Sequence, residues 1–402
     1  MIDVAEALAL IFQYVKPPAA ELVAVEESLG LVLAENVVSD IDSPPHDKSL
    51  VDGYAVIAAD LSSGPRDFTV LEEVTAGEVP TKQVRSGQAT RIMTGAPLPD
   101  GADAVVMVES SETLDEQTVR LLEYPATAGQ NIMWKATSLA RGQCVLKRGR
   151  LISPADIGLM SEVGTAIVLT NPAASVAVLA TGNELVSADQ VPQDGQIRNS
   201  NGPMLTALAQ RSGARTVDLG IARDSEEDLR RLIRTGLNSD ILVLSGGVSA
   251  GVLDLVPKVL GELGVRQVFH KVRLKPGKPL WFGIFEDAAG DTLVFGLPGN
   301  PVSSLVCFEL FVRTAIATFG NRPADVETTR ARITEDLSHK GDRETYWPGF
   351  CYTESNTLFV RPLDWKGSAD LCTLSNANCL IRVASPNSQL KKNETVEVRR
   401  LV

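Results

Sequence analysis

Apolar and polar residues alternate with two different periods between residues 174 and 322. Short apolar runs such as ASVAVLAT, DILVLS and DTLVFG alternate with amphipathic segments such as NGPMLTALAQRSG and EEDLRRLIRTGL. Uninterrupted apolar runs are typical of strands buried on both faces, and apolar side chains three or four residues apart are typical of helices. This part of the chain therefore predicts an α/β domain whose parallel sheet is covered by helices on both faces.

The rest of the chain predicts smaller units of a different character. Residues 1–40 have the apolar spacing of helices, and the proline-rich break DSPPHDKSL follows them. Residues 51–137 hold the short strand-like runs YAVIA, FTVLEEV and AVVMVE between Gly, Pro and Asp, which predicts a β-rich module. From residue 323 onward, runs such as TLFVRPL and ETVEVRRL predict a small closing β domain.

Composition limits the partners that the protein can have. The chain has 402 residues with a formal charge of −12, and broad binding of nucleic-acid backbones needs clustered basic residues instead. No run approaches the roughly 18 uncharged apolar residues of a membrane span. Asp3 and Glu6 stand where a signal peptide would be basic, so we expect a cytoplasmic protein without a nucleic-acid or membrane partner. The five cysteines form no CxxC pair, so any metal should be a hard ion held by carboxylates.

Three glycine-bearing loops each follow an apolar strand of the α/β region: TGNEL, SGGVSAG and LPGNPVSS. Ligands of open α/β sheets bind outside the carboxyl ends of the strands, so the three loops should converge there. Glycines let backbone amides approach a phosphate, although each loop taken alone is equally well explained as a turn. If the loop is a cradle, Gly247→Val should block the ligand and leave the fold intact. The motifs GxxxxGK[ST] and GxGxxG are absent, which excludes ordinary P-loop and dinucleotide sites.

Charged residues accompany these loops. Lys275 and Lys278 flank a Pro-Gly turn in RLKPGKPLWFG and could present two point charges to an oxyanion, or they could be solvated surface lysines. The acids are Glu184, Asp224 and Asp254, of which Asp254 could equally be a helix cap. Carboxylates beside phosphate-binding loops and lysines are typical of Mg²⁺-assisted phosphoryl chemistry.

Several of these blocks together resemble one known family. They are PPHDKSLVDGYAV, RIMTGAPLPDGADAVVMVE, ATGNEL, SGGVSAGVLD, LKPGKPLWFG and GLPGNPVSS, in order over essentially the whole chain. The chain thereby resembles the molybdopterin molybdenumtransferases, the family that includes the gephyrin E domain. The resemblance implies four parts, which are an irregular N-terminal domain, a β-rich insertion, an α/β nucleotide-binding-like domain and a C-terminal β-barrel-like domain. Their implied bounds are residues 1–45 with 138–173, 46–137, 174–322 and 323–402.

The resemblance also implies a reaction and its participants. Adenylylated molybdopterin and molybdate would react in a Mg²⁺-dependent step to give molybdenum cofactor and AMP. The active sites would lie between the protomers of a homodimer. A molybdopterin adenylyltransferase would supply the substrate, and molybdoenzymes or their chaperones would accept the product. Molybdate and tungstate carry the same charge and are nearly the same size, so the sequence does not choose between them.

Site residues follow from matching positions of the family. The resemblance assigns catalytic roles to Asp52, Thr94, Glu184, Asp224 and Asp254. It places Glu184 and Asp254 at the metal. The implied cofactor-binding residues are Ser245, Gly246, Gly247, Ser249, Lys275, Lys278, Pro298, Pro301 and Ser368.

Three departures from the family pattern remove acids. Ser138 in KATSLARG stands where the family has an acid, Asn199 replaces an aspartate, and Val252 replaces a glutamate. Fewer carboxylates should weaken the binding of a hard cation. Two alternatives to the ordinary transferase therefore stay open: a paralogue that binds molybdopterin or nucleotide with little or no turnover, and a dimeric scaffold without chemistry.

Overall fold

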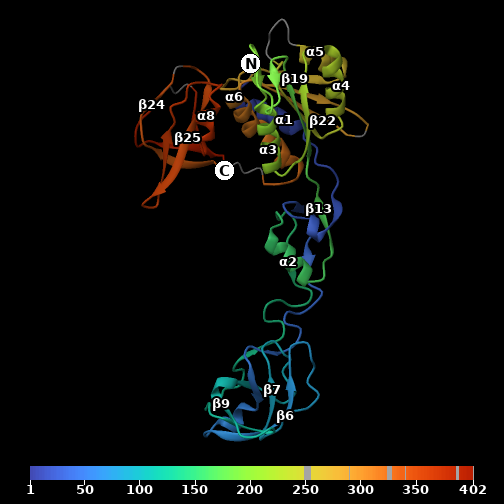
Figure 1. Cartoon of the computed structure of the whole chain (residues 1–402), viewed down its shortest axis with the longest axis vertical. Coiled ribbons are helices and arrows are strands. Elements are labelled where there is room, and N and C mark those ends of the chain that lie inside the picture. The colour runs from blue at the N-terminus through green and yellow to red at the C-terminus, as the bar shows by residue number, and fades with distance from the viewer. Residues whose placement is uncertain (249–254, 289, 324–327, 340, 386–388, 402) are drawn as a thin grey trace. The chain divides into compact units, whose positions relative to one another are not determined.

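The computed structural model describes residues 1–248, 255–288, 290–323, 328–339, 341–385 and 389–401. The chain forms two compact units, whose elements are labelled in Figure 1. The first unit comprises Met1–Leu22, Gly30–Ala34 and Leu169–Val402, and the second comprises Val23–Leu29 and Glu35–Val168. The four domain bounds inferred from the sequence stay a prediction.

A six-stranded sheet with the order β17-β14-β18-β22-β21-β19 forms the centre of the α/β region. Its strands are β14 (Ser175–Thr181), β17 (Arg215–Ala222), β18 (Ile241–Ser245), β19 (Arg266–His270), β21 (Trp281–Phe285) and β22 (Thr292–Leu297). The first four strands in this order are parallel, whereas β21 and β19 are antiparallel to their neighbours. The predicted parallel pairing is wrong for β21, which runs against both of its neighbours, whereas β19 runs in the same direction as the four parallel strands. Parallel pairing needs a crossover of a dozen or more residues, and the connections 271–280 and 286–291 are shorter than that.

Helices cover both faces of this sheet, as the sequence predicts. Alternate side chains of β14 enter two separate cores, with Val176 and Val178 in one and Ala177 and Leu179 in the other. The first core includes residues of α1 (Val4–Tyr14), α3 (Asn201–Arg211), α6 (Pro301–Cys307) and α7 (Arg313–Phe319). The second core includes residues of α4 (Glu226–Gly236) and α5 (Leu255–Glu262).

The segment Pro301–Phe319 is a continuous helix in which a π-helical turn (Phe308–Val312) joins α6 to α7. By length and composition this helix could cross a membrane, but 78% of the tested window is buried inside the protein, as in a core helix. Glu309 is fully buried in it, and its carboxylate pairs with Arg211 and with Arg313, the latter at 2.9 Å. Arg399 donates to the Glu309 carbonyl, and burial lowers the pKa of Arg399 to about 10. The carboxylate therefore lies among three arginines.

The C-terminal sheet has the order β20-β25-β26-β23-β29-β27, and a further pairing of β25 with β27 closes it into a barrel-like form. Its strands are β20 (Leu274–Lys275), β23 (Thr328–Ile333), β25 (Glu344–Glu354), β26 (Thr357–Pro362), β27 (Cys379–Val383) and β29 (Thr395–Arg400). The short strand β20 comes from the α/β region and pairs with β25 through Lys275 and Thr345. Lys275 therefore lies where the two parts of the first unit meet.

The second unit contains a six-stranded sheet, as the β-rich pattern predicts. Its strands are β5 (Gly53–Val56), β6 (Arg66–Val74), β7 (Gln88–Ile92), β8 (Ala104–Met107), β9 (Ser111–Thr113) and β10 (Thr118–Leu121). The helical prediction for residues 1–40 is correct only for α1. Pro17 and Pro18 cannot continue a helix, and the residues after them form β1 (Glu21–Ala24), β2 (Val32–Leu33) and β3 (Val37–Val38).

Candidate functional site

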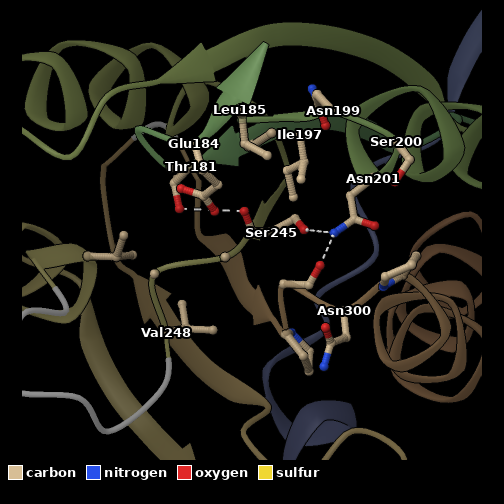
Figure 2. A pocket seen from close by; sticks show the side chains of 18 of the residues that line it. Thr181, Glu184, Leu185, Ile197, Asn199, Ser200, Asn201, Ser245, Val248 and Asn300 are labelled. Carbon is tan, nitrogen blue, oxygen red and sulfur yellow. Dashed lines mark hydrogen bonds between the residues drawn. The ribbon is translucent and has the colours of Figure 1, made fainter. Parts of the chain in front are cut away.

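A cavity of about 750 Å³ lies at the carboxyl ends of β14, β18 and β22. The three glycine loops all contribute to its lining, through Gly182, through Gly246 with Gly247, and through Gly299. Figure 2 shows Thr181 and Glu184 on the left, Ser245 near the centre, and Asn199, Asn201 and Asn300 toward the right. The predicted convergence of the loops is therefore confirmed, whereas their binding of phosphate stays a prediction. We call this space the first cavity.

Asn201 ties the floor of the first cavity together. Its Nδ2 donates to Ser245 Oγ and to the carbonyl oxygen of Gly299, each at 2.7 Å (Figure 2). The Gly246 amide donates to Leu297 O at 3.1 Å, which links the same two loops a second time. The sequence analysis missed Asn201, because an asparagine at a helix start suggests only a local cap. Its contacts hold Ser245 and Gly299 together, and the predicted site residues Ser245, Pro298 and Pro301 all line this one cavity.

The first two glycines of SGGVSAG are required by the fold itself. Gly246 and Gly247 have φ of +94° and +64°, values that favour glycine. A Cβ on Gly246 would lie 2.6 Å from Thr181 O, and one on Gly247 would lie 2.7 Å from Val256 Cγ2. A side chain at position 247 therefore meets protein atoms whether or not a ligand is present. The expectation that Gly247→Val leaves the fold intact is wrong.

We expect Gly247→Ala to lower the free energy of unfolding by roughly 1–3 kcal/mol, because it combines left-handed backbone with overpacking. Urea unfolding of the two proteins measures this difference. Gly261→Ala in α5 is the matched control, since its Cβ would meet open space and alanine favours a helix. If both variants unfold at the same urea concentration, the steric account of Gly247 is wrong.

Two of the three predicted acids of the α/β region reach the first cavity. Glu184 and Asp224 both line it and are exposed. Asp224 Oδ2 accepts from the Asn183 amide at 3.1 Å, and the Asp224 amide donates back to Asn183 Oδ1 at 3.1 Å. Asp254 lies outside the described residues, as do Ser249 and Val252. Among the residues that the structure describes, no three or more His, Cys, Asp or Glu are grouped so that they could hold a metal ion.

The predicted lysine pair lines a second cavity of about 430 Å³. This second cavity contains Lys275 and Lys278 together with Ser368, as the sequence predicts for an anion site. Pro279, Pro298 and Asn300 line both cavities, so the two spaces adjoin within the first unit. The further lining residues with polar or aromatic side chains are Ser303, Arg343, Trp347, Trp365 and Lys366.

The indole rings and Arg343 shape this second cavity. The rings of Trp347 and Trp365 meet edge to face at 5.0 Å between centroids, and their N–H groups donate to backbone carbonyls. Arg343 Nη1 donates to Leu274 O at 3.1 Å, which attaches β25 to β20 beside Lys275. The sequence analysis missed Arg343, because only the pairing of β20 with β25 brings it near the lysines. Lys366 could have been predicted from the sequence, since it lies two residues before Ser368 in WKGSAD.

Asp52 and Thr94 contact each other in the second unit. The Thr94 hydroxyl and amide donate to Asp52 Oδ1 at 2.6 and 2.7 Å. The hydroxyl bond and then the amide bond hold the pKa of Asp52 below its usual value, so the carboxylate is ionised at neutral pH. Neither residue lines the first or the second cavity, and their catalytic role stays a prediction.

Two of the acid replacements lie in described parts of the chain. Asn199 lines the first cavity, and its Oδ1 accepts from the Gly202 amide at 2.9 Å in the first turn of α3. An aspartate would offer the same acceptor, so this departure keeps the cap and removes only the charge. Ser138, in the second unit, donates its amide to Ser43 O at 2.9 Å.

We therefore expect Asn199→Asp to change the free energy of unfolding by less than about 0.5 kcal/mol, and Asn199→Ala to lower it by about 1 kcal/mol through loss of the cap. Thermal unfolding of the two variants beside the parent measures both effects. An equal loss in both variants would show that the side chain does not act as a cap.

Comparison with known proteins identifies relatives over the whole length of the chain. Three family models match: the MoeA N-terminal region (domain I and II) over residues 2–164, the probable molybdopterin binding domain over 177–318, and the MoeA C-terminal region (domain IV) over 330–401. Molybdopterin molybdenumtransferase of Staphylococcus aureus (strain MRSA252) is 33% identical over 99% of this chain and 95% of its own length. The Bacillus subtilis (strain 168) protein of the same name is 32% identical over 99% and 93%.

Solved structures show the same relationship. A molybdopterin biosynthesis MoeA protein from Pyrococcus horikoshii superposes with a TM-score of 0.81 at 31% identity, covering 100% of this chain and 99% of that one. The fold and the family matches thus define a multidomain protein whose α/β region matches the family model of a probable molybdopterin binding domain and whose C-terminal sheet is barrel-like. The chain belongs to the molybdopterin molybdenumtransferase (MoeA) family.

Proposed function

We propose that this protein inserts molybdenum from molybdate into adenylylated molybdopterin, releasing AMP and giving molybdenum cofactor. The observation that carries the proposal is the pair of adjoining cavities, one at the glycine loops and one lined by lysines and an arginine. A substrate with a phosphate-bearing body fits the first, and a tetrahedral oxyanion fits the second. The names of the relatives at 32–33% identity support the same activity.

The first cavity would hold the phosphate end of adenylylated molybdopterin. Ser245, Gly246 and Gly247 leave the backbone close to the space without side chains in the way, and Asn201 keeps that backbone fixed. Fixed donors and dipoles need little reorganisation when charge develops on the phosphate that leaves with AMP. Glu184, which lines this cavity, would be a ligand for a Mg²⁺ ion, and the second proposed ligand, Asp254, lies outside the described residues.

The second cavity would hold molybdate beside the bond that breaks. Lys275, Lys278 and Arg343 would neutralise the dianion, and the adjoining walls Pro298 and Asn300 would place it next to the phosphate end of the substrate. Two cations and a guanidinium would also stabilise negative charge that passes to the departing AMP. We further propose a homodimer, a molybdopterin adenylyltransferase as substrate donor, and molybdoenzymes or their chaperones as acceptors of the product.

Complementation tests this proposal against the binding-only and scaffold alternatives. A strain that lacks its own molybdenumtransferase would express this chain, and the activity of a molybdoenzyme would be measured. We expect activity to return, because the neutral Asn199 retains the cap and the lysine pair is intact. If soluble protein accumulates and molybdoenzyme activity stays absent, the transferase proposal fails, and the binding-only or scaffold alternative is favoured.

A further inference from the structure

The charged lining of the second cavity consists of hydrogen-bond donors. Its four charged side chains are Lys275, Lys278, Arg343 and Lys366, and none of the residues that line it, all within the described ranges, is Asp or Glu. Of the carboxylates close by in sequence, Asp342 pairs with Arg273 and Asp370 caps α8 (Leu371–Ser375), whereas Asp364 pairs with Lys366 of the lining itself. An anion bound in this cavity must therefore supply the acceptors.

Ser303 and Ser368 are the lining residues whose hydroxyl can either donate or accept. Asn300 Nδ2 lies 2.9 Å from Ser368 Oγ and donates to it. The Val302 amide donates to Ser368 O at 3.1 Å, so the two loops are attached at two points. Figure 2 shows the amide oxygen of Asn300 turned toward the first cavity and its nitrogen turned away. With Oγ already accepting from Asn300, the hydroxyl hydrogen is available to donate into the second cavity.

We propose that Asn300 sets the oxyanion specificity of the second cavity by holding Ser368 as a donor. The inference rests on the proposed function and refines it, since it requires a fully deprotonated tetrahedral dianion. Molybdate and sulfate offer acceptors only. Hydrogen phosphate carries a proton that would face a lysine, an arginine or the Ser368 hydrogen, and an unpaired donor of this kind is costly.

Sulfate and hydrogen phosphate give a matched test, because they share a tetrahedral shape and, at mildly alkaline pH, a double negative charge, and they differ in one proton. The full chain would be titrated calorimetrically with sodium molybdate in the presence of each competitor. For the parent protein we expect sulfate to compete at least about tenfold better than phosphate, as one unpaired donor would cause.

Asn300→Asp should remove this preference. The carboxylate would accept the Ser368 hydrogen and also offer an acceptor to a phosphate proton, so molybdate and sulfate affinity should fall by about tenfold or more while phosphate loses less. Ser368→Ala should narrow the ratio of sulfate to phosphate affinity in the same direction. Asn238→Asp makes the same charge change at the exposed end of α4 and should leave the ratio as in the parent.

The ratio separates specificity from a merely structural role, because a loosened loop weakens all anions alike. Equal binding of sulfate and phosphate by the parent would overturn the inference. The inference would also be overturned if Asn300→Asp kept the parental ratio of sulfate to phosphate affinity. That result is expected if Ser368 donates to Asn300 in the parent protein. Failure of the proposed function would give a different result. AMP release would then not respond to molybdate, even though sulfate still outcompetes phosphate for the second cavity.

Discussion

Replacing Lys275 and Lys278 together with alanine is expected to lower molybdate-dependent AMP release by about 100-fold or more, since loss of a single preorganised electrostatic group already costs that much in other enzymes. Both lysines line the second cavity with Arg343, and the double variant leaves the guanidinium and the exposed Lys366 as its cations. We expect the double variant mainly to need more molybdate for a given rate of AMP release, so a higher molybdate concentration should restore part of the rate.

The control is Lys391→Ala, which removes a cation of the same type from an exposed ion pair with Asp336. Exposed pairs contribute little, so we expect this variant to retain the parental rate within about twofold. Circular dichroism and thermal unfolding confirm that the double variant is folded. A folded double variant that releases AMP at the parental rate would show that the second cavity is not the molybdate site.

Glu309→Ala is expected to lower the free energy of unfolding by about 3 kcal/mol, because breaking a buried ion pair leaves uncompensated charge. The Glu309 side chain is fully buried, whereas Arg211 and Arg313 are partly exposed and can recover some hydration, which favours the lower end of the usual range. Arg399 of β29 and the carbonyl of Leu401 join the same network, so the loss should also loosen the C-terminal sheet.

Urea unfolding measures this effect, with Glu262→Ala as the matched carboxylate. Glu262 is exposed on α5 and pairs with Arg230, so its removal should cost less than about 1 kcal/mol. If the two variants are equally stable, the buried network around Glu309 contributes no more than a surface ion pair.

The α/β region was predictable from sequence because its central strands are buried on both faces. Val176 to Leu179 form an unbroken apolar run, and alternate residues enter two cores, which is the pattern that a doubly covered strand needs. The reversed direction of β21 was not predictable in the same way, since an apolar pattern is the same for both directions of a strand. Only the short connections distinguish them.

The residues of the candidate site also differ in this respect: local sequence motifs reveal some of them, and only long-range contacts reveal others. Gly246 and Lys275 stand in loops with local signatures, and both line the cavities where such loops place them. Arg343 has no such signature, because its importance depends on the pairing of β20 with β25. Asn300 stands in LPGNPVSS, but that motif does not show its contact with Ser368, 68 positions away. Contacts of this kind come from tertiary structure and leave little trace in a single sequence.

The most direct test of the central claim is AMP release from adenylylated molybdopterin by the purified chain, measured with and without molybdate. We predict that the rate rises with molybdate to saturation, that one AMP appears for each molybdenum inserted, and that the rise is lost when Lys275 and Lys278 are alanine. A folded parent protein that binds adenylylated molybdopterin and releases no more AMP with molybdate than without it would contradict the assignment of a molybdenum-inserting enzyme.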